Sequence, residues 1–341
     1  MNPAVYLRLI LAWMAALPAL VMPYTLRMGY INFLSLMIHL PLKTFGKIAH
    51  YLLKELNIRP RQAKVEKTPI TLPPVTEMKD KVCILYSGGS DSTCVAALAT
   101  RSFREIDLLT FSEEATRKSP LPTKNTELLK ARYPGTKFQS FHYDIDDKVR
   151  FLSYEQYIPG LKKHGLLVLA TCAYSSLSWH LRTIEHCLKN NIQDVQDGQT
   201  RELMHFPGHM DEVLEEFRKM YASYGIRYTN PVREWPVPAD QQFIDQVIVN
   251  SHASEFFLGD ADKNGRKTTG QFLFDEGIFP SPNVKGSRWD FLNQHECYPF
   301  ALYNILTFWN FLSFEPYPVY CQRVRALVAD KIETAKKVYL G

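Results

Sequence analysis

The sequence predicts an α/β fold, a doubly wound parallel sheet of the Rossmann-like kind, and three observations lead to this prediction. Short apolar runs rich in strand-forming residues alternate with segments of helical periodicity. The hexapeptide SGGSDS at 87–92 stands between one such run and a helical segment. The chain has 341 residues, of which 46% are apolar, and is therefore long enough for one large or two ordinary domains with a real core.

The alternation begins at residue 81 and continues for more than a hundred residues. The expected strands are 81–87, 105–111, 137–145, 166–172 and 193–198. The expected helices start at 91, lie near 124–132, run from the end of the fourth strand to about 189, and cover 211–224. Repetition of this kind is typical of a parallel sheet with helices on both faces, in which ligands bind at the carboxyl ends of the strands.

We expect four regions along the chain. These are an apolar, basic helical segment at 1–55, a proline-rich linker at 56–80, the α/β domain at 81–255 and a mostly helical C-terminal region at 256–341. In the last region, residues 299–314 form an almost wholly apolar helix candidate. A second helix there is predicted from apolar residues at helical spacing, namely Val324, Leu327, Val328, Ile332, Ala335 and Val338.

Positive charge and apolarity are both concentrated at the N-terminus. Residues 1–70 hold nine basic and two acidic residues, a charge of +7 in a chain whose net charge is +5, so the remainder sums to −2. Residues 9–26 and 28–42 contain no Asp, Glu, Lys or Arg. About 18 residues is the lower limit for crossing a bilayer. Helices that lie in the membrane interface, with the basic series against anionic headgroups, fit these lengths as well as a crossing does.

Membrane association is therefore predicted for the first region, with the following domain in the cytoplasm at the inner face of a membrane. A signal peptide is a competing interpretation, because a charged start, an apolar run and small residues are all present. In a third interpretation the segment packs on its own domain or on a second copy of the chain, as in a homodimer.

The loop at 87–92 has the chemistry of a phosphate site. Two glycines at a strand end let the backbone turn tightly and approach a ligand without an intervening Cβ. The loop can offer three backbone amides, from Gly88, Gly89 and Ser90, and three hydroxyls, from Ser87, Ser90 and Ser92. These donors lie beside the positive end of the following helix, where phosphate oxygens bind. Asp91 is suited to holding Mg²⁺ against those oxygens.

Several other chemistries are disfavoured by the sequence. The Walker pattern G-x-x-x-x-G-K-[ST] and the dinucleotide pattern G-x-G-x-x-G are both absent. Six cysteines without a C-x-x-C pair argue against a disulfide scaffold and against a zinc ribbon. His205 and His209 stand four apart, but Pro207 and Gly208 interrupt the helix that would aim both at one metal.

The hexapeptide SGGSDS resembles the pyrophosphate-binding PP-loop of the ATP-pyrophosphatases, the adenine nucleotide alpha-hydrolase-like superfamily. That group includes tRNA thiolases, sugar amidotransferases of surface-polysaccharide pathways and the deazaguanine nitrile synthase. The resemblance covers about residues 80–255. It implies that the loop holds the β- and γ-phosphates of ATP with Mg²⁺ on Asp91.

The resemblance also implies further contacts with ATP. The end of the second strand, at Thr110, Phe111 and Ser112, would meet adenine. A later strand-end motif would complete the site, and here it corresponds to DGQTRE at 197–202, with ATP contacts from Asp197, Gly198 and Gln199. Glu202 is the acidic residue near this motif.

The implied reaction has two steps. A substrate carbonyl or carboxylate oxygen attacks the α-phosphorus of ATP, pyrophosphate leaves, and the adenylated carbon then accepts a nitrogen or sulfur nucleophile while AMP leaves. Cys172 is expected to end the fourth strand and begin a helix whose dipole would lower its thiol pKa. By resemblance to the thiolases, Cys172 and Cys297 are the candidate catalytic cysteines, with Cys321 in reserve.

Three functions remain open on the sequence alone. The first is an adenylating enzyme that transfers nitrogen to a small-molecule or membrane-linked acceptor, such as a surface-polysaccharide sugar, with ammonia from a partner protein or from solution. The second is a tRNA or small-molecule thiolase that uses Cys172 and a sulfur-donor protein. The third is a sensor or interaction module that binds ATP without turnover.

One further loop, GDADKNGRKTTGQ at 259–271, begins like an EF-hand but has Gln271 where calcium loops carry Glu. Its basic residues Lys263, Arg266 and Lys267 suggest instead a flexible loop that closes over phosphates or an acidic substrate.

Overall fold

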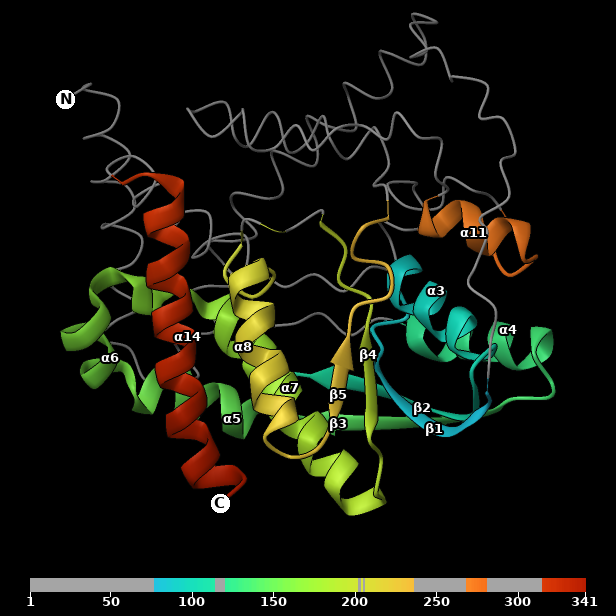
Figure 1. Cartoon of the computed structure of the whole chain (residues 1–341), viewed down its shortest axis with the longest axis horizontal. Helices are drawn as coiled ribbons and strands as arrows, with labels where there is room; N and C mark the ends of the chain where they lie inside the picture. The colour runs from blue at the N-terminus through green and yellow to red at the C-terminus, as the bar shows by residue number, and fades with distance from the viewer. Residues whose placement is uncertain (1–76, 114–119, 202–203, 205, 236–267, 281–314) are drawn as a thin grey trace, which may run out of the picture.

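The computed structural model describes residues 77–113, 120–201, 204, 206–235, 268–280 and 315–341, and in this part of the chain five strands form one parallel sheet (Figure 1). The strands are β1 (Lys79–Leu85), β2 (Phe103–Ser112), β3 (Lys137–Asp144), β4 (Asp194–Asp197) and β5 (Arg227–Thr229). Their order is β3-β2-β1-β4-β5, and every neighbouring pair is parallel. The predicted α/β fold with a parallel sheet is confirmed.

Helices cover both faces of this sheet. On one face lie α3 (Ser90–Ala99), α4 (Leu121–Arg132) and α11 (Thr269–Asp275). On the other face lie α7 (Thr171–Asn190), α8 (Asp211–Ala222) and α14 (Tyr317–Tyr339). Shorter elements join β3 to α7, namely α5 (Asp146–Arg150), a π-helical turn η1 (Phe151–Glu155), α6 (Tyr157–His164) and a 3-10 turn η2 (Gly165–Leu169).

The burial of the strands explains their sequences. β1 is the middle strand, so its apolar residues are covered alternately from the two faces: Val82 and Ile84 pack with α3, whereas Cys83 and Leu85 pack with α7. A continuous apolar run is what a strand with both faces covered requires. β3 is an edge strand and alternates between exposed and more buried positions along KFQSFHYD, which is the pattern of a strand with one solvated side.

The prediction of a strand at 166–172 is wrong. The segment forms the 3-10 turn η2, which begins at Gly165 in the left-handed region (φ 60°), and α7 starts already at Thr171. Leu167, Val168 and Leu169 are buried without pairing in the sheet. A short buried apolar run has the same composition in a strand and in a helical turn, so periodicity could not distinguish the two.

The two described parts of the C-terminal region, α11 and α14, pack on opposite faces of the sheet. α11 places Phe272 and Leu273 against α3. The predicted amphipathic helix is confirmed as α14, which packs against α7 and α8 through Val324, Leu327, Val328, Ile332 and Ala335, while Val338 is exposed.

Several predictions concern residues outside the described part of the chain: the segments 1–55 and 299–314, most of the loop 259–271, His205, Glu202 and Cys297. Among the helices that the structure describes, none has the length and apolarity needed to cross a membrane.

Candidate functional site

The strand order places the SGGSDS loop at a switch point of the sheet. The chain leaves β1 toward α3 on one face, and it leaves β4 toward α8 on the opposite face. β1 and β4 are neighbours, and the register pairs Leu85 with Asp197 at their carboxyl ends. In open α/β sheets, ligands bind at such a point, outside the carboxyl ends of the two strands.

Close backbone contacts decide the shape of the loop. Gly88 has a positive φ of 74°, and a Cβ there would lie 2.4 Å from the backbone nitrogen of Pro122 at the start of α4. The buried Asn125 of α4 donates from Nδ2 to the Gly88 carbonyl at 2.6 Å. Gly88 therefore cannot be replaced without strain, because its positive φ favours glycine and the Pro122 backbone leaves no space for a Cβ.

The serines of the loop bond to one another. The Gly89 amide lies 3.3 Å from Ser87 Oγ, Ser87 Oγ lies 3.3 Å from Ser92 Oγ, and Ser92 Oγ donates to the Gly89 carbonyl at 3.3 Å. Ser90 and Ser92 are buried. Among the described residues, no side chain caps the N-terminus of α3. The first amides of a helix lack partners within the helix, so this end of α3 can serve an anion.

The loop after β4 lies directly against the SGGSDS loop. A Cβ on Gly198 would be 2.6 Å from the Ser92 amide nitrogen and 2.8 Å from the Asp91 carbonyl carbon. The structure thus brings together the two glycine segments that the resemblance assigned to one site. The contact is between backbones, and only glycine permits it.

Asp91 lies in the first turn of α3, where it accepts a hydrogen bond from the Thr269 hydroxyl at 2.5 Å. Mg²⁺ in nucleotide sites takes one or two carboxylates and completes its shell with phosphate oxygens and waters. A carboxylate beside an uncapped helix N-terminus and a glycine loop fits that requirement. In the described residues, no three His, Cys, Asp or Glu side chains gather in a metal-binding arrangement.

The residues expected to meet adenine point to different faces. The Thr110 hydroxyl is buried and donates to the Tyr86 carbonyl at 2.8 Å, within the side of the sheet covered by α3. Phe111 is on the α7 side, where its ring stacks near those of Tyr143 and Trp179, each at 6.5 Å between centroids. The Ser112 carbonyl accepts a hydrogen bond from the Ile145 amide.

Asp197 ends β4 with its carboxylate buried. The Tyr228 hydroxyl donates to Oδ2 at 2.9 Å, and the Gln199 amide donates to Oδ1 at 3.2 Å. Burial raises the pKa of the Asp197 carboxyl to about 6, although both hydrogen bonds act in the opposite direction. Gln199 is buried as well.

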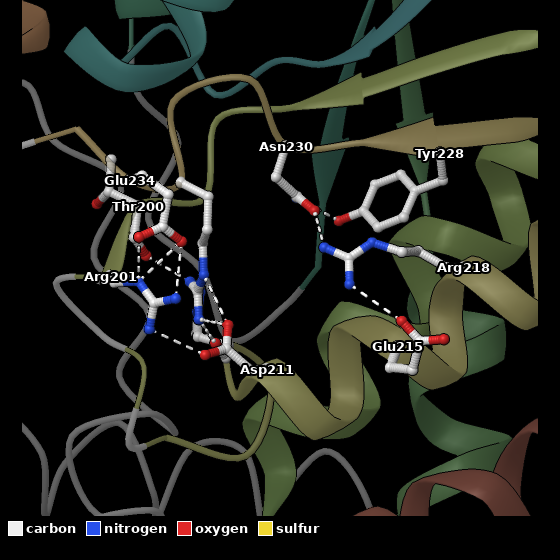
Figure 2. A network of polar contacts seen from close by, with 10 residues as sticks. Thr200, Arg201, Asp211, Glu215, Arg218, Tyr228, Asn230 and Glu234 are labelled. Atoms are coloured by element: carbon white, nitrogen blue, oxygen red, sulfur yellow. Dashed lines mark hydrogen bonds and ion pairs between the residues drawn. The ribbon is translucent and has the colours of Figure 1, made fainter.

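The partners of Asp197 continue into a polar network at this edge (Figure 2). Asn230 donates to the Tyr228 hydroxyl at 2.9 Å, and Arg218 donates to Asn230 at 3.1 Å. This series of bonds fixes the orientation of Tyr228, and with it the Asp197 carboxylate at the end of β4.

Arg233, which is buried, ties the loop after β4 to the start of α8. It donates to the Thr200 carbonyl at 2.6 Å, to the His209 carbonyl at 2.8 Å and to Asp211 at 2.8 and 3.0 Å. Arg201 lies in the same network and pairs with Glu234 and with Asp211 (Figure 2). No sequence pattern indicated Arg233, because its partners are the backbone carbonyls of Thr200 and His209 and the distant Asp211.

The pKa of the Cys172 thiol is shifted in the direction opposite to the one expected. It lies in the first turn of α7 and its Sγ accepts the Gly208 amide at 3.0 Å. Burial nevertheless raises the pKa of this thiol to about 12, so the expected lowering of its pKa is wrong. Burial also raises the pKa of Cys321 to about 12. Every described cysteine is buried and none is in a disulfide.

Glu113 is a candidate that sequence analysis missed. It follows β2 directly, it is 5% exposed, and the Ser175 hydroxyl of α7 lies 3.0 Å from each of its carboxylate oxygens. Burial raises the pKa of the Glu113 carboxyl to about 7, with smaller contributions in the same direction from Asp146 and Asp144. Its position after a strand in the run FSEE was the available signal.

Comparison with known proteins adds little to this geometry. No family model matches the chain, and no curated protein matches it. One similar solved structure is described as a predicted subunit of a tRNA methyltransferase from Methanocaldococcus jannaschii, at 16% identity and a TM-score of 0.30. The match covers 49% of this chain and 75% of that chain. A likeness of this extent identifies neither an activity nor a substrate.

Proposed function

We propose that the protein is an adenylating enzyme that binds Mg²⁺-ATP at 87–92 and converts it to AMP and pyrophosphate. One observation carries the proposal: the glycine loop after β1 and the glycine after β4 meet backbone to backbone at the N-terminus of α3, which no side chain of the described residues caps. This arrangement leaves no room for side chains where phosphate oxygens need amide donors.

In the first step an acceptor carbonyl or carboxylate oxygen attacks the α-phosphorus. A bond forms between that oxygen and phosphorus, and the bond from the α-phosphorus to the bridging oxygen breaks, so that pyrophosphate leaves with the electron pair. The amides of Gly88, Gly89 and Ser90 would bind the β- and γ-phosphate oxygens. Mg²⁺, when bound at Asp91, would neutralise charge on those oxygens.

In the second step a nitrogen nucleophile attacks the adenylated carbon, and the bond from that carbon to the AMP oxygen breaks. The nitrogen must lose a proton, and we assign Glu113 as the group that accepts it. Its buried carboxylate lies at the same carboxyl edge of the sheet, and its pKa of about 7 suits a general base at neutral pH. A nitrogen nucleophile is favoured over a sulfur nucleophile, because the Cys172 thiol is buried and its raised pKa keeps it protonated.

The acceptor is proposed only as a class. It carries a carbonyl or carboxylate and would be a small molecule or a membrane-linked compound such as a surface-polysaccharide sugar. tRNA is the alternative acceptor, to be included in the same screen. Ammonia would come from solution or from a partner protein.

The decisive experiment is a product assay on the full chain with Mg²⁺ and ATP labelled at the α- or γ-phosphate, screened over candidate acceptors. The enzyme should release AMP and pyrophosphate with the right acceptor. Asp91→Asn should lower this rate by about 100-fold or more, since the metal carboxylate is lost. Asp80→Asn is the matched control, because Asp80 is exposed and pairs only with Arg104 among the contacts described.

Two other results would contradict the proposal. Release of ADP and phosphate would mean a kinase-like or ATPase chemistry. Stoichiometric binding of ATP without pyrophosphate release, with every acceptor tried, would favour a sensor or interaction module.

We also propose that residues 1–55 hold the protein at the inner, cytoplasmic face of a membrane. The support is the apolar, basic sequence of this segment. The full chain should co-sediment with vesicles that contain phosphatidylserine and should be released by high salt. Equal recovery in the supernatant with and without such vesicles would exclude the proposal.

A further inference from the structure

Asp91 of the SGGSDS loop is contacted by a residue that lies 178 positions further along the chain. Thr269 is the first residue of α11, and its hydroxyl donates to Oδ1 of Asp91 at 2.5 Å. Thr269 is 3% exposed. Asp91 is the carboxylate that the proposed function assigns to Mg²⁺, so a residue that holds it bears directly on that site.

The orientation of Thr269 is fixed by its own helix. The preceding residue, Thr268, caps α11 by accepting the Gln271 amide on its hydroxyl at 3.1 Å. This bond sets where the helix begins. The Thr269 side chain is therefore presented to α3 by a regular first turn.

Packing that does not involve Thr269 keeps α11 in place. Phe272 and Leu273 are buried in the cluster that contains α3, and the Phe272 ring meets Trp235 edge to face at 5.7 Å. At the other end, Arg132 Nε donates to the Glu276 carbonyl at 2.6 Å, and the Tyr133 hydroxyl donates to its carboxylate at 3.1 Å. Removal of the Thr269 hydroxyl should therefore leave the helix seated.

We infer that Thr269 is a positioning residue for the Mg²⁺ carboxylate, so that α11 supplies an essential part of the metal site. A hydroxyl that donates to one carboxylate oxygen restricts the rotation of Asp91 and directs the group toward the phosphate loop. Hydrogen bonds that orient a metal-binding carboxylate are commonly worth 10- to 100-fold in metal affinity. The inference rests on the proposed function, because it presupposes that Asp91 binds Mg²⁺.

The test compares ATP affinity with and without metal. Thr269→Val removes the hydroxyl and keeps the side-chain shape, Thr269→Ser restores the donor, and Thr100→Val is the matched control. Thr100 lies at the opposite end of α3 and donates to the Ala97 carbonyl, remote from the loop. Binding of ATP to the full chain is measured by calorimetry in excess Mg²⁺ and in EDTA. The bound fraction of Mn²⁺ in the presence of ATP is measured by electron paramagnetic resonance.

Thr269→Val should weaken ATP binding by about 10-fold in Mg²⁺, lower the fraction of bound Mn²⁺, and leave affinity in EDTA unchanged. Thr269→Ser should regain most of the loss, and Thr100→Val should bind like the wild type. Equal Mg²⁺-ATP affinity for Thr269→Val and wild type would overturn the inference alone. An equal loss in Mg²⁺ and in EDTA would overturn it too, because Thr269 would then act on the loop rather than on the metal. If the wild type bound no ATP, the proposed function would fail and the inference with it.

Discussion

The two faces of the sheet reach the carboxyl edge with different chemistry. On the face covered by α3, α4 and α11, the loop at 87–92 is held by backbone contacts of glycine and by hydrogen bonds from Asn125, Ser92 and Thr269. On the face covered by α7, α8 and α14, the edge carries buried titratable groups, Glu113, Asp197 and Cys172, each with a raised pKa. The proposed phosphate side of the site therefore depends on shape, whereas the side with Glu113 depends on protonation.

The largest effect is expected from adding one methyl group on the face covered by α3. Gly88→Ala places a Cβ 2.4 Å from the Pro122 backbone at a positive φ, and should lower the free energy of unfolding by about 4 kcal/mol. Gly198→Ala should lower it less. Both should weaken ATP binding by about 100-fold, because a shift of about 1 Å misplaces the phosphate donors. Urea denaturation and calorimetry measure the two effects.

Gly225→Ala is the control for both variants. Gly225 also has a positive φ, of 70°, but no atom lies within 4 Å of its added Cβ. Gly225→Ala should lower the free energy of unfolding by only about 1 kcal/mol and leave ATP affinity unchanged. If Gly198→Ala bound ATP like the wild type, close approach of the two loops would not be what shapes the site.

The second face should respond to pH through Glu113. The unfolded chain loses this proton near its ordinary pKa of 4.5, whereas the folded protein keeps it until a pKa of about 7. Raising the pH through this window therefore favours the unfolded state, by about 3 kcal/mol for this one group. The free energy of unfolding should therefore fall less between about pH 5 and about pH 8 in Glu113→Gln than in the wild type.

The control for Glu113→Gln is Glu127→Gln, an exposed glutamate on α4 that pairs with Lys130. Its pH dependence of unfolding should follow the wild type. An identical pH dependence for Glu113→Gln and wild type would show that Glu113 is ionised in the folded protein, which would remove the basis for its role as a base.

A smaller effect is expected where the chain crosses from one face to the other after β5. Val232 packs with the α3 cluster, and the next residue, Arg233, binds the loop after β4. Arg233→Met should lower the free energy of unfolding by about 2 kcal/mol, because two carbonyls and Asp211 lose a charged donor. Arg201→Met should lower the free energy of unfolding by less than about 1 kcal/mol, because the ion pairs of Arg201 are exposed. Equal losses would mean that burial of Arg233 adds nothing.

The smallest effect should come from Cys172→Ser. A serine hydroxyl can still accept the Gly208 amide, so the fold and amide-forming turnover should both persist. The pyrophosphate-release assay with the identified acceptor measures this. Loss of turnover with ATP binding intact would instead support the thiolase alternative, and Cys297→Ser should be assayed beside it.

Much of the architecture could be predicted along the chain. The runs KVCILYS, EIDLLTF and KFQSFHYDI were expected as strands, and each overlaps one because its apolar pattern fits burial in a parallel sheet. The strand predicted for LLVLATC is absent, because a short apolar run does not show whether neighbouring segments will pair with it in a sheet or pack against it as a helical turn. The loop at 87–92 was also predictable, since all of its components are consecutive.

Other parts of the candidate site could not be predicted, because they are contacts between distant segments. Asn125 and Thr269 are common polar residues in ordinary helices, and only packing places them on Gly88 and Asp91. The raised pKa of Cys172 could not be predicted from the sequence either. A helix N-terminus lowers a thiol pKa, but the depth of burial, which sequence does not give, has the larger and opposite effect.

Patterns along the chain are enough to predict the α/β fold class, the position of the glycine loop between β1 and α3, and the separation of a basic, apolar N-terminal segment from a slightly acidic remainder. The groups that surround that loop, and the buried groups that keep their protons, follow from tertiary packing. The physical reason is that strand and turn signals are local in the chain. Hydrogen-bond partners and desolvation depend instead on atoms that folding brings from far along the chain.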